Sequence, residues 1–159
     1  MRTASAPTLL GRALRWLSAR EYTRAELAQR LGPFEEAPGQ VQTVLDTLEQ
    51  KGFLSDARAA QSLVHRRQGK LGSARIGQEL RQKGVAPELL RDTLESLRAT
   101  ERERAQAVWI QKFGVPATDR AGQMRQMRFL AARGFATETI RQVVPRPTGV
   151  AALDTDDVE

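Results

Sequence analysis

Residues 80–90 read LRQKGVAPELL and residues 130–140 read LAARGFATETI, and the match between these two stretches decides the fold. Both begin with leucine, place a base before a glycine and an apolar residue after it, and continue with a glutamate and a further apolar residue at the same offsets. A helix ends most easily at a residue with positive φ, a conformation that penalises any Cβ. We therefore expect each glycine to end a helix and the next residue to pack back on it.

Gly32 is the corresponding helix end in the first third of the chain, so three such glycines are spaced 52 and 50 residues apart. A unit of about 50 residues buries little core alone but can stack on its neighbours. The sequence thus predicts an all-α protein of three tandem three-helix repeats, helix-turn-helix-like, forming an elongated, curved, solenoid-like molecule.

Apolar residues recur three and four positions apart along most of the chain, which is the pattern of helices with one buried face. Sustained alternation typical of strands is absent from the sequence. We predict a flexible N-terminus at 1–8, repeats at 9–54, 55–99 and 100–145, and a disordered acidic tail at 146–159.

Several helix starts are visible as capping residues. Thr23 and Glu26 have the spacing of a capping box, in which each side chain accepts a backbone N–H of the first turn. The expected N-caps of later helices are Asp56, Ser73 and Asp119. We also expect Pro87 in the first turn of a helix and an i,i+4 ion pair between Glu79 and Lys83.

The charge is strongly positive outside the tail. The chain has 25 Lys+Arg and 19 Asp+Glu, and four of the acids lie in the last six residues. Residues 1–153 therefore carry a net charge of +10. A body this basic attracts polyanions, with nucleic acid the leading candidate. Many of these charges can equally be solvated helix faces.

Other residue counts exclude whole classes of chemistry. The chain has no cysteine and one histidine, His65. These counts exclude thiolate metal sites, disulfides and catalytic relays built from several histidines. We find no nucleophile elbow, phosphate-binding glycine loop or ligand-spaced carboxylates. We predict a non-enzymatic, cytoplasmic binding protein without cofactor, metal or small-molecule substrate. No apolar run approaches the length of a membrane span.

Two blocks of the sequence resemble a known family. The stretch GFLSDARAA at 52–60, continued by Gly69, Gly72 and the Lys83-Gly84-Val85 triplet, is similar to the central block of the RecX family of bacterial recombination regulators. The stretch RFLAARGF at 128–135 is similar to that family's C-terminal block. The resemblance extends from about Ala13 to Val144, and Ala59 departs from it where the family commonly has an aromatic residue.

The resemblance implies a monomer that binds the RecA filament on single-stranded DNA, with weaker direct binding to DNA. Such a protein opposes filament extension and lowers strand exchange, ATP hydrolysis and the co-protease activity behind the SOS response. Its place would be in the regulation of DNA repair.

Basic side chains of the second and third repeats are the candidate contacts, because arginine binds phosphate and carboxylate bidentately. The candidates are Arg58, His65, Arg66, Arg67, Lys70, Arg75, Arg125, Arg128 and Arg133. Trp16 and Trp109 are expected in the core. Aromatic residues are scarce and not interleaved with the bases, which disfavours binding of single strands by stacking.

A helix-turn-helix transcription regulator is the alternative reading of the first third. Residues 22–32 and 40–52 resemble two such helices, the second of which would enter the major groove. The segment between them is longer than the usual turn of three or four residues, and a winged version needs a β-hairpin after Phe53.

Overall fold

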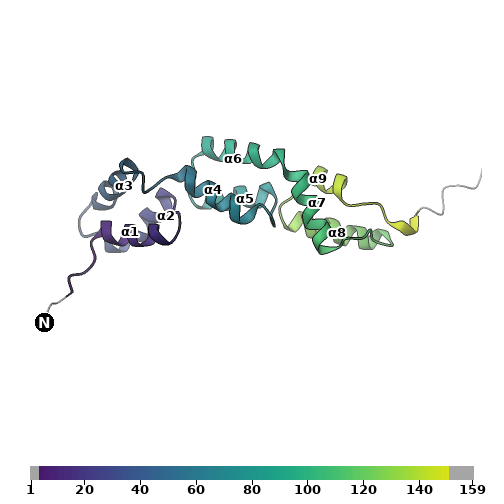
Figure 1. The fold of residues 1–159 in the computed structure, drawn as a ribbon, viewed down its shortest axis with the longest axis horizontal. Coiled ribbons are helices and arrows are strands. Elements are labelled where there is room, and N and C mark those ends of the chain that lie inside the picture. The colour runs from purple at the N-terminus through teal and green to yellow at the C-terminus, as the bar shows by residue number, and fades with distance from the viewer. Residues whose placement is uncertain (1–3, 151–159) are drawn as a thin grey trace, which may run out of the picture. The chain divides into compact units, whose positions relative to one another are not determined.

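The computed structural model of the protein describes residues 4–150, and these form two compact units. One unit holds residues 4–63 and 80–90, and the other holds residues 64–79 and 91–150. The predictions for residues 1–3 and 151–159, including the four acids of the tail, lie outside the described residues. Every regular element between residues 4 and 150 is helical, so the all-α prediction is confirmed (Figure 1).

The elements follow one another as three groups of three α-helices. They are α1 (Leu9–Ala19), α2 (Arg24–Leu31), α3 (Gln40–Gln50), α4 (Asp56–Arg67), α5 (Ser73–Gln82), α6 (Pro87–Ala99), α7 (Glu101–Lys112), α8 (Arg120–Ala132) and α9 (Thr137–Val143). Two short 3-10 turns, η1 (Gly32–Phe34) and η2 (Thr148–Val150), complete the described chain. The division between the two units falls within α4, α5 and α6.

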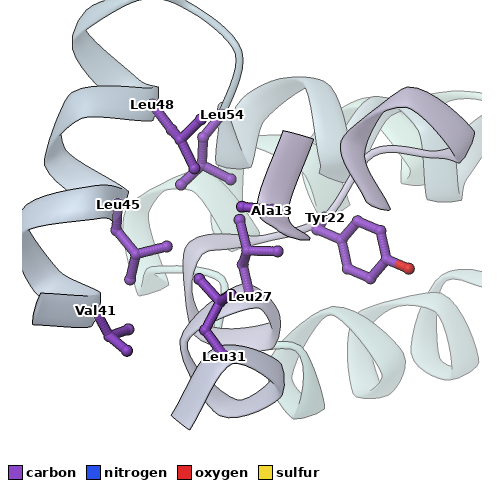
Figure 2. Packing of buried hydrophobic residues seen from close by; sticks show 8 residues of the cluster. All are labelled: Ala13, Tyr22, Leu27, Leu31, Val41, Leu45, Leu48 and Leu54. Carbon is purple, nitrogen blue, oxygen red and sulfur yellow. The ribbon is translucent and has the colours of Figure 1, made fainter. Parts of the chain in front are cut away.

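The first unit packs around apolar side chains of α1, α2 and α3. Figure 2 shows Leu27 and Leu31 of α2 facing Leu45 and Val41 of α3, and Ala13 of α1 joins the same cluster. Burying one leucine of this kind stabilises the fold by about 1.5–3 kcal/mol. Most of these residues follow the apolar spacing seen in the sequence, but Leu14 of the same spacing in α1 is 37% exposed.

The first glycine of the predicted repeat behaves differently from the others. Gly84 and Gly134 have φ values of 77° and 88°, as expected, and Val85 and Phe135 after them are buried. Gly32 instead has φ −48°, and the chain continues into η1. Pro33 follows it, and a residue before proline tolerates the α-region poorly unless it lacks a Cβ. The prediction of a positive-φ helix end at Gly32 is therefore wrong.

The N-terminus of α5 receives the C-terminus of α8 through the backbone. The N–H groups of Gly72 and Ala74 donate to the carbonyls of Arg133 and Gly134 at 2.8 and 3.2 Å. The chains approach so closely that a Cβ on Gly72 would lie 2.3 Å from the Gly134 carbonyl carbon. This junction lies wholly in the second unit.

An equivalent junction in the first unit joins the start of α2 to the end of α5. The Thr23 hydroxyl donates to the Lys83 carbonyl at 2.5 Å, and Lys83 Nζ lies 2.7 Å from Glu26 Oε1. A Cβ on Gly84 would lie 2.5 Å from Ala25 Cβ. The matched glycines thus end helices at positions where another helix begins.

Each junction also carries an acid from the following group of helices. Asp56 Oδ1 accepts the Arg24 N–H at 2.7 Å, and Glu101 Oε1 accepts the Ser73 N–H at 2.9 Å. Asp56 and Glu101 are the first residues of α4 and α7. Carboxylates stabilise helix N-termini because they satisfy unpaired N–H groups and oppose the positive end of the helix dipole.

These contacts overturn several local predictions. The N-cap position of α4 is filled by Ser55, whose hydroxyl accepts the Arg58 N–H at 3.2 Å, because the Asp56 carboxylate turns to α2. Ser73 is the first residue of α5 and does not cap it, since its own N–H is accepted by Glu101.

The predicted ion pair between Glu79 and Lys83 does not form. Glu79 pairs with Arg67 instead, and Lys83 pairs with Glu26. The Thr23–Glu26 capping box and the Asp119 cap of α8 are confirmed.

Arg104 of α7 anchors the segment between α4 and α5. Its guanidinium donates to the carbonyls of Gln68, Leu71 and Leu97 at 3.1, 2.8 and 3.0 Å. Burial lowers the pKa of Arg104, and the negative charge of Glu101 acts in the opposite direction. A buried arginine whose donors are satisfied by carbonyls fixes this loop against α7.

The end of the described chain packs against the start of α8. The N–H groups of Thr148 and Gly149 donate to the carbonyls of Ala117 and Thr118, both at 3.0 Å. The sequence places these two residues at the start of the predicted tail. They form η2 with Val150, after which the described chain ends.

Gly134, which is crowded, can be compared with Gly52, which is open. We expect Gly134→Ala to lower the free energy of unfolding by about 2–4 kcal/mol, because the new Cβ meets Arg75 Cγ at 2.4 Å in addition to the positive-φ penalty. Gly52→Ala, with φ 76° and open space around it, should cost only about 1–2 kcal/mol. Urea denaturation measures both, and equal losses would contradict the close approach.

Glu26 should make the stability depend on pH. Burial alone would raise the pKa of Glu26, but the hydrogen bonds from Lys83 and the Thr23 N–H outweigh it and lower the pKa. A lowered pKa stabilises the fold above the ordinary glutamate value, and this contribution is lost as pH falls through the folded-state pKa. Glu26→Gln should therefore cost about 1–2 kcal/mol at pH 7 and much less near pH 3. A deficit that stays constant with pH would contradict this origin.

Candidate functional site

Four of the predicted contact residues surround the end of α4. His65, Arg66, Arg67 and Lys70 are all exposed. Arg67 also forms a two-point ion pair with Glu79. Its Nε lies 3.2 Å from Glu79 Oε2, and its Nη2 donates to Glu79 Oε1 at 3.3 Å. This pair joins α4 to α5, so part of the binding capacity of Arg67 is used within the protein.

Two other candidates have structural partners of their own. Arg58 lies in the first unit, where it pairs with Glu21 at 3.1 Å and donates to the Gly52 carbonyl at 2.8 Å. Arg75 donates to the Ala132 carbonyl at 2.8 Å, and its side chain lies against Gly134. Arg75 is therefore part of the junction between α5 and α8.

The third group of helices supplies Arg125, Arg128 and Arg133. Arg125 and Arg128 are exposed on α8, while Arg133 at its end is half-buried. Residues four apart share one side of a helix, which aligns Arg125, Phe129 and Arg133. Arg133 Cζ lies 4.8 Å from the centre of the Phe129 ring.

A shallow pocket in the second unit brings Lys70 and Arg133 together. Its volume is about 300 Å³, and its lining comprises Gly69, Lys70, Val108, Gln111, Lys112, Phe129 and Arg133. Lys112, at the end of α7, was not among the predicted residues, and its Nζ lies 5.4 Å from the Phe129 ring centre. Three cations and an aromatic ring from three separate segments thus line this pocket. We call it the α7–α8 pocket.

The two tryptophans do not form part of this surface. Trp109 is buried, and its indole N–H donates to Gln126 Oε1 at 2.9 Å, so its assignment to the core is confirmed. Trp16 is half-buried against the core of the first unit, with Arg30 Cζ 4.5 Å from its ring centre.

The described residues offer little to other kinds of site. Between residues 4 and 150, no three potential metal ligands of the His, Cys, Asp and Glu types gather together. In the same range, no helix has both the length and the apolar character required to cross a membrane.

Sequence comparisons identify the family. Residues 55–94 match the model of the second three-helix domain of RecX, and residues 100–144 match that of the third. The regulatory protein RecX of Leptothrix cholodnii is 48% identical over 86% of this chain and 87% of its own length. That of Herbaspirillum seropedicae is 41% identical over 94% and 95%. The chain belongs to the RecX family.

Solved RecX structures have the same fold. The crystal structure of RecX from Lactobacillus salivarius matches with a TM-score of 0.73 at 19% identity, over 85% of this chain and 91% of that one. A second RecX crystal structure gives a TM-score of 0.70 at 21% identity, over 85% of this chain and 70% of its own. These likenesses support the RecX helical-repeat fold.

RecX membership bears on the alternative of a winged helix-turn-helix regulator. In the described chain, the residues after Phe53 enter α4 and not a β-hairpin. The start of α4 is occupied in capping α2 through Asp56. The segment after the first three helices is thus another helical group.

The site geometry separates structural from surface cations. We expect Arg75→Ala to lower the free energy of unfolding by about 1–2 kcal/mol, because it removes the charged donor to the Ala132 carbonyl. Arg128→Ala, at an exposed position of α8, should change it by less than about 0.5 kcal/mol. Thermal unfolding followed by circular dichroism would test the difference. Equal losses of unfolding free energy for the two variants would show that Arg75 does not stabilise the junction.

Proposed function

We propose that the protein binds the RecA filament on single-stranded DNA and inhibits filament extension, strand exchange, ATP hydrolysis and co-protease activity. Membership of the RecX family over most of the chain carries this proposal. A cytoplasmic, monomeric protein without catalytic activity, acting in the SOS response and DNA repair, fits the same role. Direct binding to DNA would be weaker than binding to the filament.

The distribution of charge supports a polyanionic partner. Lys70, Arg125 and Arg128 are exposed and form no ion pair among residues 4–150. Unpaired cations can bind phosphate without first breaking an internal bond, and they release counterions from the nucleic acid. His65 and Arg66 at the end of α4 extend this basic character.

The candidates with internal partners have a smaller role in the proposal. Arg58, Arg67 and Arg75 hold carboxylates or carbonyls of the protein itself. Reversing the charges of Arg67 and Arg75 would disturb the fold as well as any binding surface. The exposed arginines of α8 are therefore the better positions for testing contact with the filament.

The filament assay tests the proposal. Added to RecA of Leptothrix cholodnii preassembled on single-stranded DNA, the protein should reduce the steady rate of DNA-dependent ATP hydrolysis at or below one molecule per RecA. An Arg125→Gln, Arg128→Gln variant should require about tenfold more protein, since each lost phosphate contact weakens binding. The control is Arg98→Gln, Arg141→Gln, which removes the same charge from exposed positions of α6 and α9.

Two outcomes would contradict parts of this proposal. If both double variants inhibit like the original protein, the α8 arginines are not the contact surface. If the original protein leaves filaments unchanged but binds one duplex sequence tightly, the transcription-regulator alternative replaces the proposal.

A further inference from the structure

The α7–α8 pocket is lined by positive charge without a compensating acid. Lys70 comes from the segment between α4 and α5, Lys112 from the end of α7 and Arg133 from the end of α8. No carboxylate is among the lining residues, and none of the three cations forms an ion pair within residues 4–150. Three like charges so placed favour a bound anion.

The Phe129 ring gives the pocket order as well as an apolar wall. Lys112 Nζ and Arg133 Cζ lie 5.4 and 4.8 Å from its centre, within the range of cation–π attraction. Phe113 contacts the same ring edge-on at 5.4 Å between ring centres. The ring is thus fixed by one aromatic neighbour and in turn orients two of the cations.

The junction described above fixes the remaining walls. The Arg133 carbonyl accepts the Gly72 N–H at 2.8 Å, and Arg104 holds the carbonyls of Gln68 and Leu71 on either side of Lys70. The segment that carries Lys70 is therefore held by both α7 and α8. A pocket whose walls are already fixed loses less conformational entropy on binding a ligand than a flexible one does.

The lining specifies the chemistry of the ligand. Cations bind phosphate, whereas Val108 and Phe129 offer apolar surface to a planar ring. A volume of about 300 Å³ is at the small end of ligand pockets, as one nucleotide requires. In a duplex the bases stay stacked between the strands, so a base can reach such a wall only from a single strand.

We propose that the α7–α8 pocket binds one nucleotide of single-stranded nucleic acid, with its phosphate on Lys70, Lys112 and Arg133 and its base against Phe129. This inference rests on the proposed function for the origin of the strand, which is the DNA of the filament. It also revises the expectation that stacking is disfavoured. In the sequence Phe129 stands beside Arg128, whereas the fold brings Lys70 and Lys112 from other segments into the same pocket.

Direct binding of a single strand tests the pocket without RecA. The probe is a fluorescein-labelled oligothymidylate of about twelve nucleotides, measured by fluorescence anisotropy with the full chain. Lys112→Gln should weaken binding about threefold to tenfold and make the slope of log affinity against log salt shallower by about 0.7. Arg98→Gln, an exposed control on α6, should leave both unchanged.

The role of the ring has its own controls. Phe129→Leu should weaken binding of the oligothymidylate about fivefold or more, while Phe129→Tyr, which keeps the ring, should retain it. Phe53→Leu, at a phenylalanine that is 51% exposed in the first unit, should have no effect. On an abasic oligonucleotide of the same length, Phe129→Leu should bind as well as the original protein.

Several results would overturn the pocket. Equal loss by Phe129→Leu on intact and abasic strands would show that the base does not contact the ring. Displacement of the probe by free thymidine monophosphate at the same nucleotide concentration would show that the pocket takes the free nucleotide and not a strand. Unchanged binding by both Lys112→Gln and Phe129→Leu would place the strand elsewhere.

The filament assay distinguishes the two proposals. If pocket variants bind the oligonucleotide normally while the original protein inhibits RecA, the pocket inference fails and the proposed function stands. If the original protein binds the oligonucleotide through the pocket but leaves filaments unchanged, the proposed function fails instead.

Discussion

The backbone hydrogen bonds between the start of α5 and the end of α8 set the conditions for most of the second unit. The Gly72 and Ala74 N–H groups lie at a helix N-terminus, and the Arg133 and Gly134 carbonyls lie at a helix C-terminus, where such groups lack partners within their own helix. Each end satisfies the other, and their dipoles attract. The contact needs glycine at both ends, because side chains there would separate the backbones. The pocket exists because this junction brings Arg133 beside the segment that carries Lys70.

The helices and the repeated glycines could be predicted because the interactions that set them are local. A Schellman-type end needs only a glycine and a following apolar residue, and the N–H groups of Val85 and Phe135 indeed donate to the carbonyls of Leu80 and Leu130. The caps were harder to predict, because the capping acids come from distant parts of the chain. Asp56 caps α2, which begins 32 residues earlier, and Glu101 caps α5, which begins 28 residues earlier. A capping acid of this kind has the sequence appearance of an ordinary first-turn residue.

The candidate site was predictable in charge and not in detail. Counting bases indicated a polyanionic partner, but it could not show that Arg67 and Arg75 are engaged inside the protein. Lys112 and Phe129 could not be predicted from the sequence, because they form a site only together with Lys70. Lys70 is about 40 residues from Lys112 and about 60 from Phe129 along the chain. The position of Phe129 directly after Arg128 was the single local signal available.

The start of α8 is stabilised differently from the starts of α2 and α5. At the corresponding starts of α2 and α5, a following group supplies both a docking glycine and a capping acid. At α8 the chain provides its own acid, Asp119, which accepts the Gly122 N–H at 2.7 Å. Gly149 then binds the Thr118 carbonyl, so close that a Cβ would lie 2.5 Å from it. At α8, residues of the same group of helices and of η2 thus take the place that the next group takes at α2 and α5.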